Sequence, residues 1–117
     1  MQSYQRHQRV ESLIQAELNK IILRELEFDG ALVTITAVEV QKDLDYALIK
    51  FSVLPSGKKE AVLELFQKTQ RRLKHLLADQ IEIKPMPELR FEIDEGPEKA
   101  AAVEKVFIEI EKEEKNG

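Results

Sequence analysis

The spacing of apolar residues along the chain constrains the fold more than any other feature. Between residues 8 and 28, apolar side chains recur at intervals of three and four, which is typical of one face of an amphipathic helix. Residues 31–40 are rich in Val, Ile and Thr, and residues 46–54 alternate apolar and polar side chains, so both segments are predicted to be strands. The polar turn at residues 41–45 is short enough to join them as an antiparallel hairpin.

The second half of the chain also passes from a helical pattern of apolar residues to a strand pattern. After the break at Pro55-Ser56-Gly57, a helical pattern runs to about Gln80. A straight helix of about 25 residues would be about 37 Å long, so we expect a bend near its middle. Apolar and charged residues then alternate over residues 88–94, which predicts a third strand. Gly96-Pro97 is a typical start for a last helix, whose charged end at residues 111–117 is expected to fray.

The predicted order of elements is α-β-β-α-β followed by a C-terminal helix, which indicates an α+β fold. Each strand has one apolar face and each helix one apolar stripe, so the economical arrangement is a three-stranded mixed sheet with the helices on one face. The helical crossover should place the third strand parallel to the second. The 117 residues contain no flexible linker, so we expect a single domain over residues 1–117 with its core at about residues 6–110.

Composition excludes several classes of protein. The chain has no Cys, so it has neither disulfides nor thiol catalysis. The longest uncharged apolar stretch, residues 31–38, is far shorter than the roughly 20 residues of a membrane span. The N-terminus lacks the apolar region of a secretory signal, so we expect a cytoplasmic protein without a membrane segment.

Patterns that carry catalysis or bind cofactors are also missing. The only histidines are His7, near the N-terminus, and His75, inside the second helical pattern, and no serine sits in a nucleophile elbow. Paired carboxylates at positions 43 and 45 and at positions 94 and 95 lack the spacing of a cation site, so polar turns are the simpler interpretation. No glycine occurs between Gly57 and Gly96, which excludes a Gly-rich phosphate loop there. We therefore expect no enzyme, no metal site and no cofactor.

Positive charge is concentrated in the second helical pattern. The chain carries 18 basic and 22 acidic residues, a net charge of -4, which argues against a general nucleic-acid coat. Residues 56–80 nevertheless contain six basic and three acidic side chains. On a helical wheel, four side chains share the face opposite the apolar stripe: Lys68, Arg71, Arg72 and His75. Such a face can hold RNA phosphates or can simply solvate a helix, and composition alone does not decide between the two.

Three stretches of the chain resemble the bacterial ribosome-binding factor A family, and the similarity covers most of residues 6–94. The first stretch is Arg6-x-x-Arg9-Val10, with Glu17-Leu18 downstream. The second begins at Val38 and reads Val-Glu-Val-Gln-Lys-Asp-Leu-Asp-Tyr-Ala. The third, Pro-Glu-Leu-Arg-Phe-Glu-Ile-Asp at residues 87–94, is the most specific. The order and spacing of the three, taken together, carry the resemblance.

The resemblance implies a type II KH-like fold and a non-catalytic role. Proteins of this family bind the maturing small (30S) ribosomal subunit, contact its 16S rRNA and assist late maturation, notably of the 5′ region of that RNA. By this resemblance the chain is expected to have these partners, to be a cytoplasmic monomer that matters most at low temperature, and to use no small-molecule substrate or cofactor.

The chain departs from the family where the KH signature interrupts a helix. The family's Ala-x-Gly falls on Thr69-Gln70-Arg71 here, and without glycine the backbone approaches a phosphate less closely. We therefore expect contact with RNA through long side chains. The candidate RNA-binding residues are Lys68, Arg71, Arg72 and Lys74, with Arg6, Arg9 and Lys42 as a second set.

Two other functions stay open at this point. The KH-like scaffold could serve as a protein interaction module without RNA binding, with the basic face only solubilising the helix. A small hydrolase with a carboxylate-bound metal is the more remote alternative. Under the RNA-binding interpretation, the acidic residues after Glu104 are expected to suppress binding to unrelated RNA.

Overall fold

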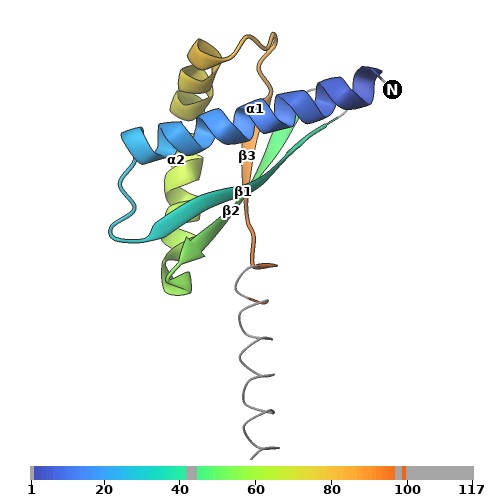
Figure 1. The fold of residues 1–117 in the computed structure, drawn as a ribbon. Coiled ribbons are helices and arrows are strands. Elements are labelled where there is room, and N and C mark those ends of the chain that lie inside the picture. The colour runs from blue at the N-terminus through green and yellow to red at the C-terminus, as the bar shows by residue number, and fades with distance from the viewer. Residues whose placement is uncertain (1, 42–44, 97–98, 100–117) are drawn as a thin grey trace, which may run out of the picture.

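The computed structural model describes residues 2–41, 45–96 and 99. Within these residues the long elements follow the order α-β-β-α-β (Figure 1), so the predicted α+β fold is confirmed. The bounds are α1, Gln2–Glu25; β1, Leu32–Val40; β2, Tyr46–Leu54; η1, a short 3-10 helix at Ser56–Lys58; α2, Lys59–Gln80; and β3, Glu88–Ile93. Gly96 and Lys99 are helical, and the amide of Lys99 donates a hydrogen bond to the carbonyl of Glu95 at 2.9 Å, whereas the rest of the helix expected after Gly96-Pro97, with its charged end, lies outside the described residues.

β2 lies in the middle of a three-stranded sheet with the order β1-β2-β3. β1 and β2 pair antiparallel, with Leu32 opposite Leu54 and Val40 opposite Ala47. β2 and β3 pair parallel, with Tyr46 opposite Glu88. Both directions agree with the sequence prediction, because a short turn reverses the chain whereas the crossover through α2 restores its direction.

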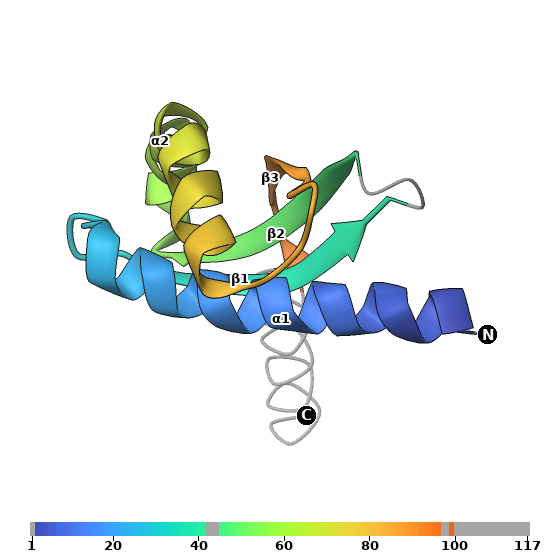
Figure 2. The ribbon, with the colours of Figure 1, turned by 90° about the horizontal axis from the view of Figure 1, so that it is seen from above.

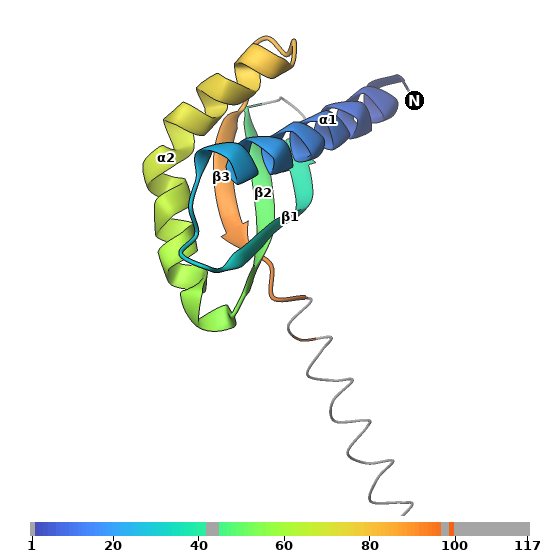
Figure 3. The same cartoon turned by 60° about the vertical axis from the view of Figure 1, so that its left-hand side comes forward.

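Both helices pack on the face of the sheet that carries its buried residues. In Figure 3, α1 crosses in front of the strands and α2 runs alongside them. Alternate residues of β2 point toward the helices and are at most 7% exposed: Ala47, Ile49, Phe51 and Val53. Phe66 of α2 is fully buried in this core, where its ring centroid lies 4.5–5.8 Å from those of Phe28, Phe51 and Phe91. Among the described residues no helix covers the opposite face of the sheet, which we call the open face.

α1 begins earlier than the apolar pattern predicts. The periodicity starts at about residue 8, but the helix begins at Gln2. The pattern misses the first turns because residues 2–9 contain one aromatic residue and no aliphatic one, so they show no apolar periodicity. α1 is long, with 24 residues, yet no helix in the described part of the chain is apolar enough to cross a membrane.

α2 is one unbroken helix whose axis curves along its length (Figure 3). Near its middle, the hydroxyl of Thr69 donates a hydrogen bond to the carbonyl of Leu65 at 2.7 Å. A bond of this kind to the residue four positions earlier often bends a helix. The expected bend is therefore present as a curve, without the interruption that a glycine kink would introduce.

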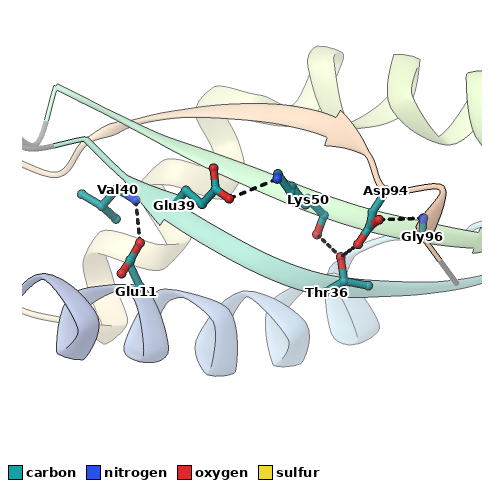
Figure 4. A network of polar contacts seen from close by, with 7 residues as sticks. All are labelled: Glu11, Thr36, Glu39, Val40, Lys50, Asp94 and Gly96. Atoms are coloured by element: carbon teal, nitrogen blue, oxygen red, sulfur yellow. Dashed lines mark hydrogen bonds and ion pairs between the residues drawn. The ribbon is translucent and has the colours of Figure 1, made fainter.

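Polar side chains of α1 fix this helix along the free edge of β1. Asn19 Oδ1 accepts a hydrogen bond from the amide of Ile35 at 3.1 Å, and Gln15 Nε2 donates one to the carbonyl of Ile35 at 3.3 Å. Nearer the N-terminus, Glu11 Oε2 accepts a hydrogen bond from the amide of Val40 at 3.0 Å (Figure 4). These bonds satisfy part of a strand edge that could otherwise pair with another chain.

Asp94 ties the end of β3 to β1 across the middle strand (Figure 4). Thr36 Oγ1 donates a hydrogen bond to Asp94 Oδ2 at 2.6 Å, and the amide of Gly96 donates one to Asp94 Oδ1 at 2.9 Å. Both bonds favour the charged carboxylate, the Thr36 bond more strongly, so they lower the pKa of Asp94 below its ordinary value of 3.8.

Acid should weaken the contact that Asp94 makes. A carboxylate whose pKa is lowered by folding stabilises the fold above its unfolded pKa, and this stabilisation is lost as the pH falls through the lowered value. We therefore expect Asp94→Asn to lower the urea midpoint near pH 7, and to make a smaller difference as the pH falls below about 4. Urea titrations of both proteins across this range measure the effect. A difference that stays constant with pH would contradict the prediction.

Candidate nucleic-acid interface

The basic residues of α2 lie on its outer face because its apolar residues face the sheet. The buried residues of α2 are Val62, Phe66, Leu73 and Leu77. The exposed residues on the other side include Lys68, Arg71, Arg72 and His75. The predicted grouping of these four side chains on one face of the helix is therefore confirmed.

The C-terminal end of α1 adds a further cation to this surface. Glu25, the last residue of α1, accepts a hydrogen bond from Arg72 Nη2 at 2.7 Å and another from Arg24 Nε at 3.1 Å, one on each carboxylate oxygen. A single carboxylate thus holds two guanidinium groups that come from two helices. We call the surface formed by Arg24, Lys68, Arg71 and Arg72 the crossing patch.

Arg24 is the residue of the crossing patch that the sequence did not reveal. Nothing in the spacing of residues shows that the end of α1 meets the middle of α2. The one available signal was the position of Arg24 in the last turn of α1, where a cation interacts favourably with the helix dipole.

The cations of the crossing patch differ in how firmly they are held. Lys68 pairs with Glu64 at 3.2 Å, but both side chains are exposed, and such pairs contribute only about 0.3–0.5 kcal/mol. Arg72 is bound to the less exposed Glu25. Arg71 is exposed and makes no ion pair with any residue that the structure describes. Arg71 is therefore the cation of the patch most available to a new anion.

Lys74 lies on a different flank of α2. At about 100° per residue, Lys74 is about 160° from Arg72 around the helix axis. Arg72 faces α1, whereas Gln70, one turn before Lys74, donates a hydrogen bond to Glu88 of β3 at 3.3 Å. Lys74 is half-buried on the flank that faces β3. It lies outside the crossing patch, and its contact with RNA stays a prediction.

The second predicted set lies at the other end of α1. Arg9 is exposed and precedes Glu25 by about 24 Å along the helix axis. The bond from Val40 to Glu11 brings this part of α1 to the end of β1, and Figure 2 shows the N-terminal half of α1 beside that end of the hairpin. Arg6 is also on α1, and Lys42 lies outside the described residues. Arg9 is thus near the hairpin end and far from the crossing patch.

The open face of the sheet carries charges of both signs. Lys50 and Glu39 form an ion pair at 3.0 Å (Figure 4), and Glu39 raises the pKa of Lys50. The guanidinium carbon of Arg90 lies 4.0 Å from the centre of the Tyr46 ring. Arg90 therefore covers one face of an aromatic ring that could otherwise stack on a base. The crossing patch, and not this face, brings several cations together.

The carboxylates of Asp94 and Glu95 have partners within the protein. Asp94 accepts hydrogen bonds from Thr36 and Gly96. Lys59 lies 3.1 Å from Glu95 and lowers the pKa of that carboxyl group. In the described ranges of the chain, no three side chains of the metal-binding types lie close enough to hold an ion together. The contacts within the protein therefore account for the adjacent carboxylates of Asp94 and Glu95.

Comparison with known sequences identifies relatives over most of the chain. The family model described as ribosome-binding factor A matches residues 6–107. The chain is 33% identical to ribosome-binding factor A of Chlorobium phaeobacteroides over 112 residues, which cover 93% of this chain and 97% of the relative. It is 36% identical to the Prosthecochloris aestuarii protein of the same name over 104 residues, which cover 86% and 85% of the two chains.

Solved structures have the same fold. The crystal structure of ribosome-binding factor A from Thermus thermophilus superposes with a TM-score of 0.67 at 25% identity, over 74% of this chain and 93% of that one. The solution structure of a putative ribosome-binding factor A from Thermotoga maritima gives a TM-score of 0.55 at 26% identity, over 74% and 88%. The chain therefore belongs to the ribosome-binding factor A family, a family of non-catalytic binding proteins.

Proposed function

We propose that the chain binds the maturing small (30S) ribosomal subunit by contacting its 16S rRNA, and that it assists late maturation of the subunit, including processing of the 5′ end of that RNA. The family name supports ribosome binding. A model of the Thermus thermophilus protein has been fitted into a cryo-EM map of its complex with the 30S subunit. We extend this partner to the present chain, which would act in the cytoplasm as a monomer without a small-molecule substrate.

The crossing patch is the observation that carries the RNA contact. Arg24 and Arg72 come from two helices and meet at Glu25. Lys68 and Arg71 are exposed on α2 within about one turn of Arg72. Only two carboxylates, Glu25 and Glu64, pair with them among the described residues. A net charge of -4 for the whole chain does not oppose this, because a structured RNA is bound through local contacts and shape.

Long side chains, and not backbone amides, would make the phosphate contacts. α2 runs without a break through Thr69-Gln70-Arg71, so its amides in this region are used inside the helix. Arginine has several donors in a planar fork that fits phosphate oxygens. Lys74 and the second set of Arg6, Arg9 and Lys42 would add phosphate contacts away from the crossing patch.

Cosedimentation with small subunits across a salt series tests the proposal. Each phosphate contact adds about 0.7–0.9 to the slope of log affinity against log salt, so three contacts alone predict a loss of roughly 20- to 40-fold between about 50 and 200 mM salt, and every further contact increases that loss. We expect immature subunits to bind more tightly than mature ones, and RNase treatment to abolish the association.

The same experiment distinguishes RNA binding from the alternative of a protein interaction module. Binding to one ribosomal protein that resists both salt and RNase would contradict RNA contact and favour the module. The maturation role has its own readout, which is the fraction of 16S rRNA with an unprocessed 5′ end in cells that lack the protein. An unchanged fraction would contradict that part of the proposal.

A further inference from the structure

Glu25 occupies a position that helix stability does not explain. It is the last residue of α1, where the partial negative charge of the helix dipole disfavours a carboxylate. Its side chain is 23% exposed, whereas those of Arg24 and Arg72 are 56% and 59% exposed. The side chain of Glu25 is thus less exposed than the two arginine side chains that it binds.

The two arginines keep most of their hydrogen-bonding capacity. Arg24 uses only its Nε on Glu25, and Arg72 uses only one Nη. A guanidinium group has five N–H donors in a fixed plane, so each arginine keeps donors for a second anion. One carboxylate between two arginines leaves one positive charge uncompensated at this point, with Lys68 one turn before Arg72 on α2.

We propose that Arg24 and Arg72 form a binding site for one phosphate of an RNA backbone, and that Glu25 is the positioning residue that holds the two guanidinium groups together. Without Glu25 the two like-charged groups would turn apart, because no other carboxylate among the described residues pairs with either arginine. The identification of the phosphate as part of 16S rRNA rests on the proposed function, whereas the anion site itself does not.

A substitution at Glu25 tests the site through the sign of its effect. Glu25→Gln removes a negative charge beside the patch, so simple electrostatics predicts tighter binding of an anion. Positioning predicts the opposite, because the amide no longer holds two cations. The control is Glu64→Gln, which makes the same chemical change and the same change in net charge at the exposed partner of Lys68.

The first measurement uses the full chain and inorganic phosphate as the probe. The side-chain Nε–H signals of Arg24 and Arg72 are followed by NMR during a phosphate titration. We expect both signals to shift together in the wild type, with the apparent Kd rising about fivefold to tenfold in Glu25→Gln and not rising in Glu64→Gln. Equal or tighter phosphate binding by Glu25→Gln, or no response of the two arginines in the wild type, would overturn the proposal.

The second measurement is cosedimentation of the same proteins with small subunits. We expect Glu25→Gln to bind about threefold to tenfold more weakly than Glu64→Gln. If the wild type and Glu25→Gln bound small subunits equally tightly, the assignment of the site to rRNA would be overturned, while the proposed function would stay intact. A positive phosphate titration without any binding to subunits would support the anion site and contradict the proposed function.

Urea titration distinguishes a positioning role of Glu25 from a purely structural one. A surface ion pair contributes about 0.2–1 kcal/mol, so Glu25→Gln should remain folded.

Arg72→Lys tests the arginine that Glu25 binds, since this substitution keeps the positive charge but loses the planar fork. Phosphate binding that Arg72→Lys leaves unchanged would contradict a site built on two guanidinium groups.

Discussion

Replacing Phe66 with alanine should lower the free energy of unfolding by about 3–5 kcal/mol, which is a large part of the 5–15 kcal/mol typical of a small protein. The side chain is fully buried. Its ring stacks on Phe91 at 4.5 Å and meets Phe51 and Phe28 edge-on at 4.8 and 5.8 Å. Removing it leaves a cavity among three rings that come from a loop and two strands, so the surroundings cannot close around it without moving several elements.

Urea titration followed by circular dichroism measures this loss. The matched control is Leu23→Ala, which removes an apolar side chain from the same layer of helices where it is 77% exposed. Surface changes of this kind stay within about 0.5 kcal/mol. If Phe66→Ala changed stability as little as Leu23→Ala, the aromatic contacts described for the core would be wrong.

The strands could be predicted closely because burial on one face gives them a period of two. β2 was predicted at residues 46–54 and is observed at Tyr46–Leu54. The N-terminal part of α1 could not be predicted in this way, because exposed turns such as the one at Arg9 carry no apolar periodicity. The contact of Phe28 with Phe66 could not be predicted from the apolar periodicity either, since it depends on how a loop packs against a distant helix.

The candidate site could be predicted only where it lies on one element. The wheel of α2 placed Arg71 and Arg72 on one outer face because helical geometry is fixed by the local sequence. The partner of Arg72 comes from α1, and only the packing of the two helices brings Glu25 within 2.7 Å of it. The separation of Lys74 from Arg72, by contrast, follows from helical geometry alone, because two positions along α2 lie about 160° apart around its axis.

Charge reversal at Arg71 should weaken binding to small subunits about 10- to 100-fold at low salt. The substitution Arg71→Glu removes a cation that we propose contacts an RNA phosphate and puts a negative charge beside that phosphate, so it should also lower the salt slope by about 1. Arg71 is the right position because it is exposed and has no ion pair in the described structure, so its loss should not disturb the fold. Arg72→Glu would instead set a carboxylate against Glu25, and its effect on binding could not be separated from its effect on helix packing.

Lys84→Glu is the matched control for this experiment. Lys84 is exposed on the loop between α2 and β3, so its reversal changes the net charge by the same amount at a position outside the crossing patch. Salt-series cosedimentation of the two variants separates a local contact from a general charge effect. If both variants bound equally weakly, the negative charge of the whole chain would be responsible, and the crossing patch would lose its role. If Arg71→Glu bound like the wild type, the outer face of α2 would only solvate the helix, and the contact with 16S rRNA would have to lie with Lys74 or with the second set around Arg9.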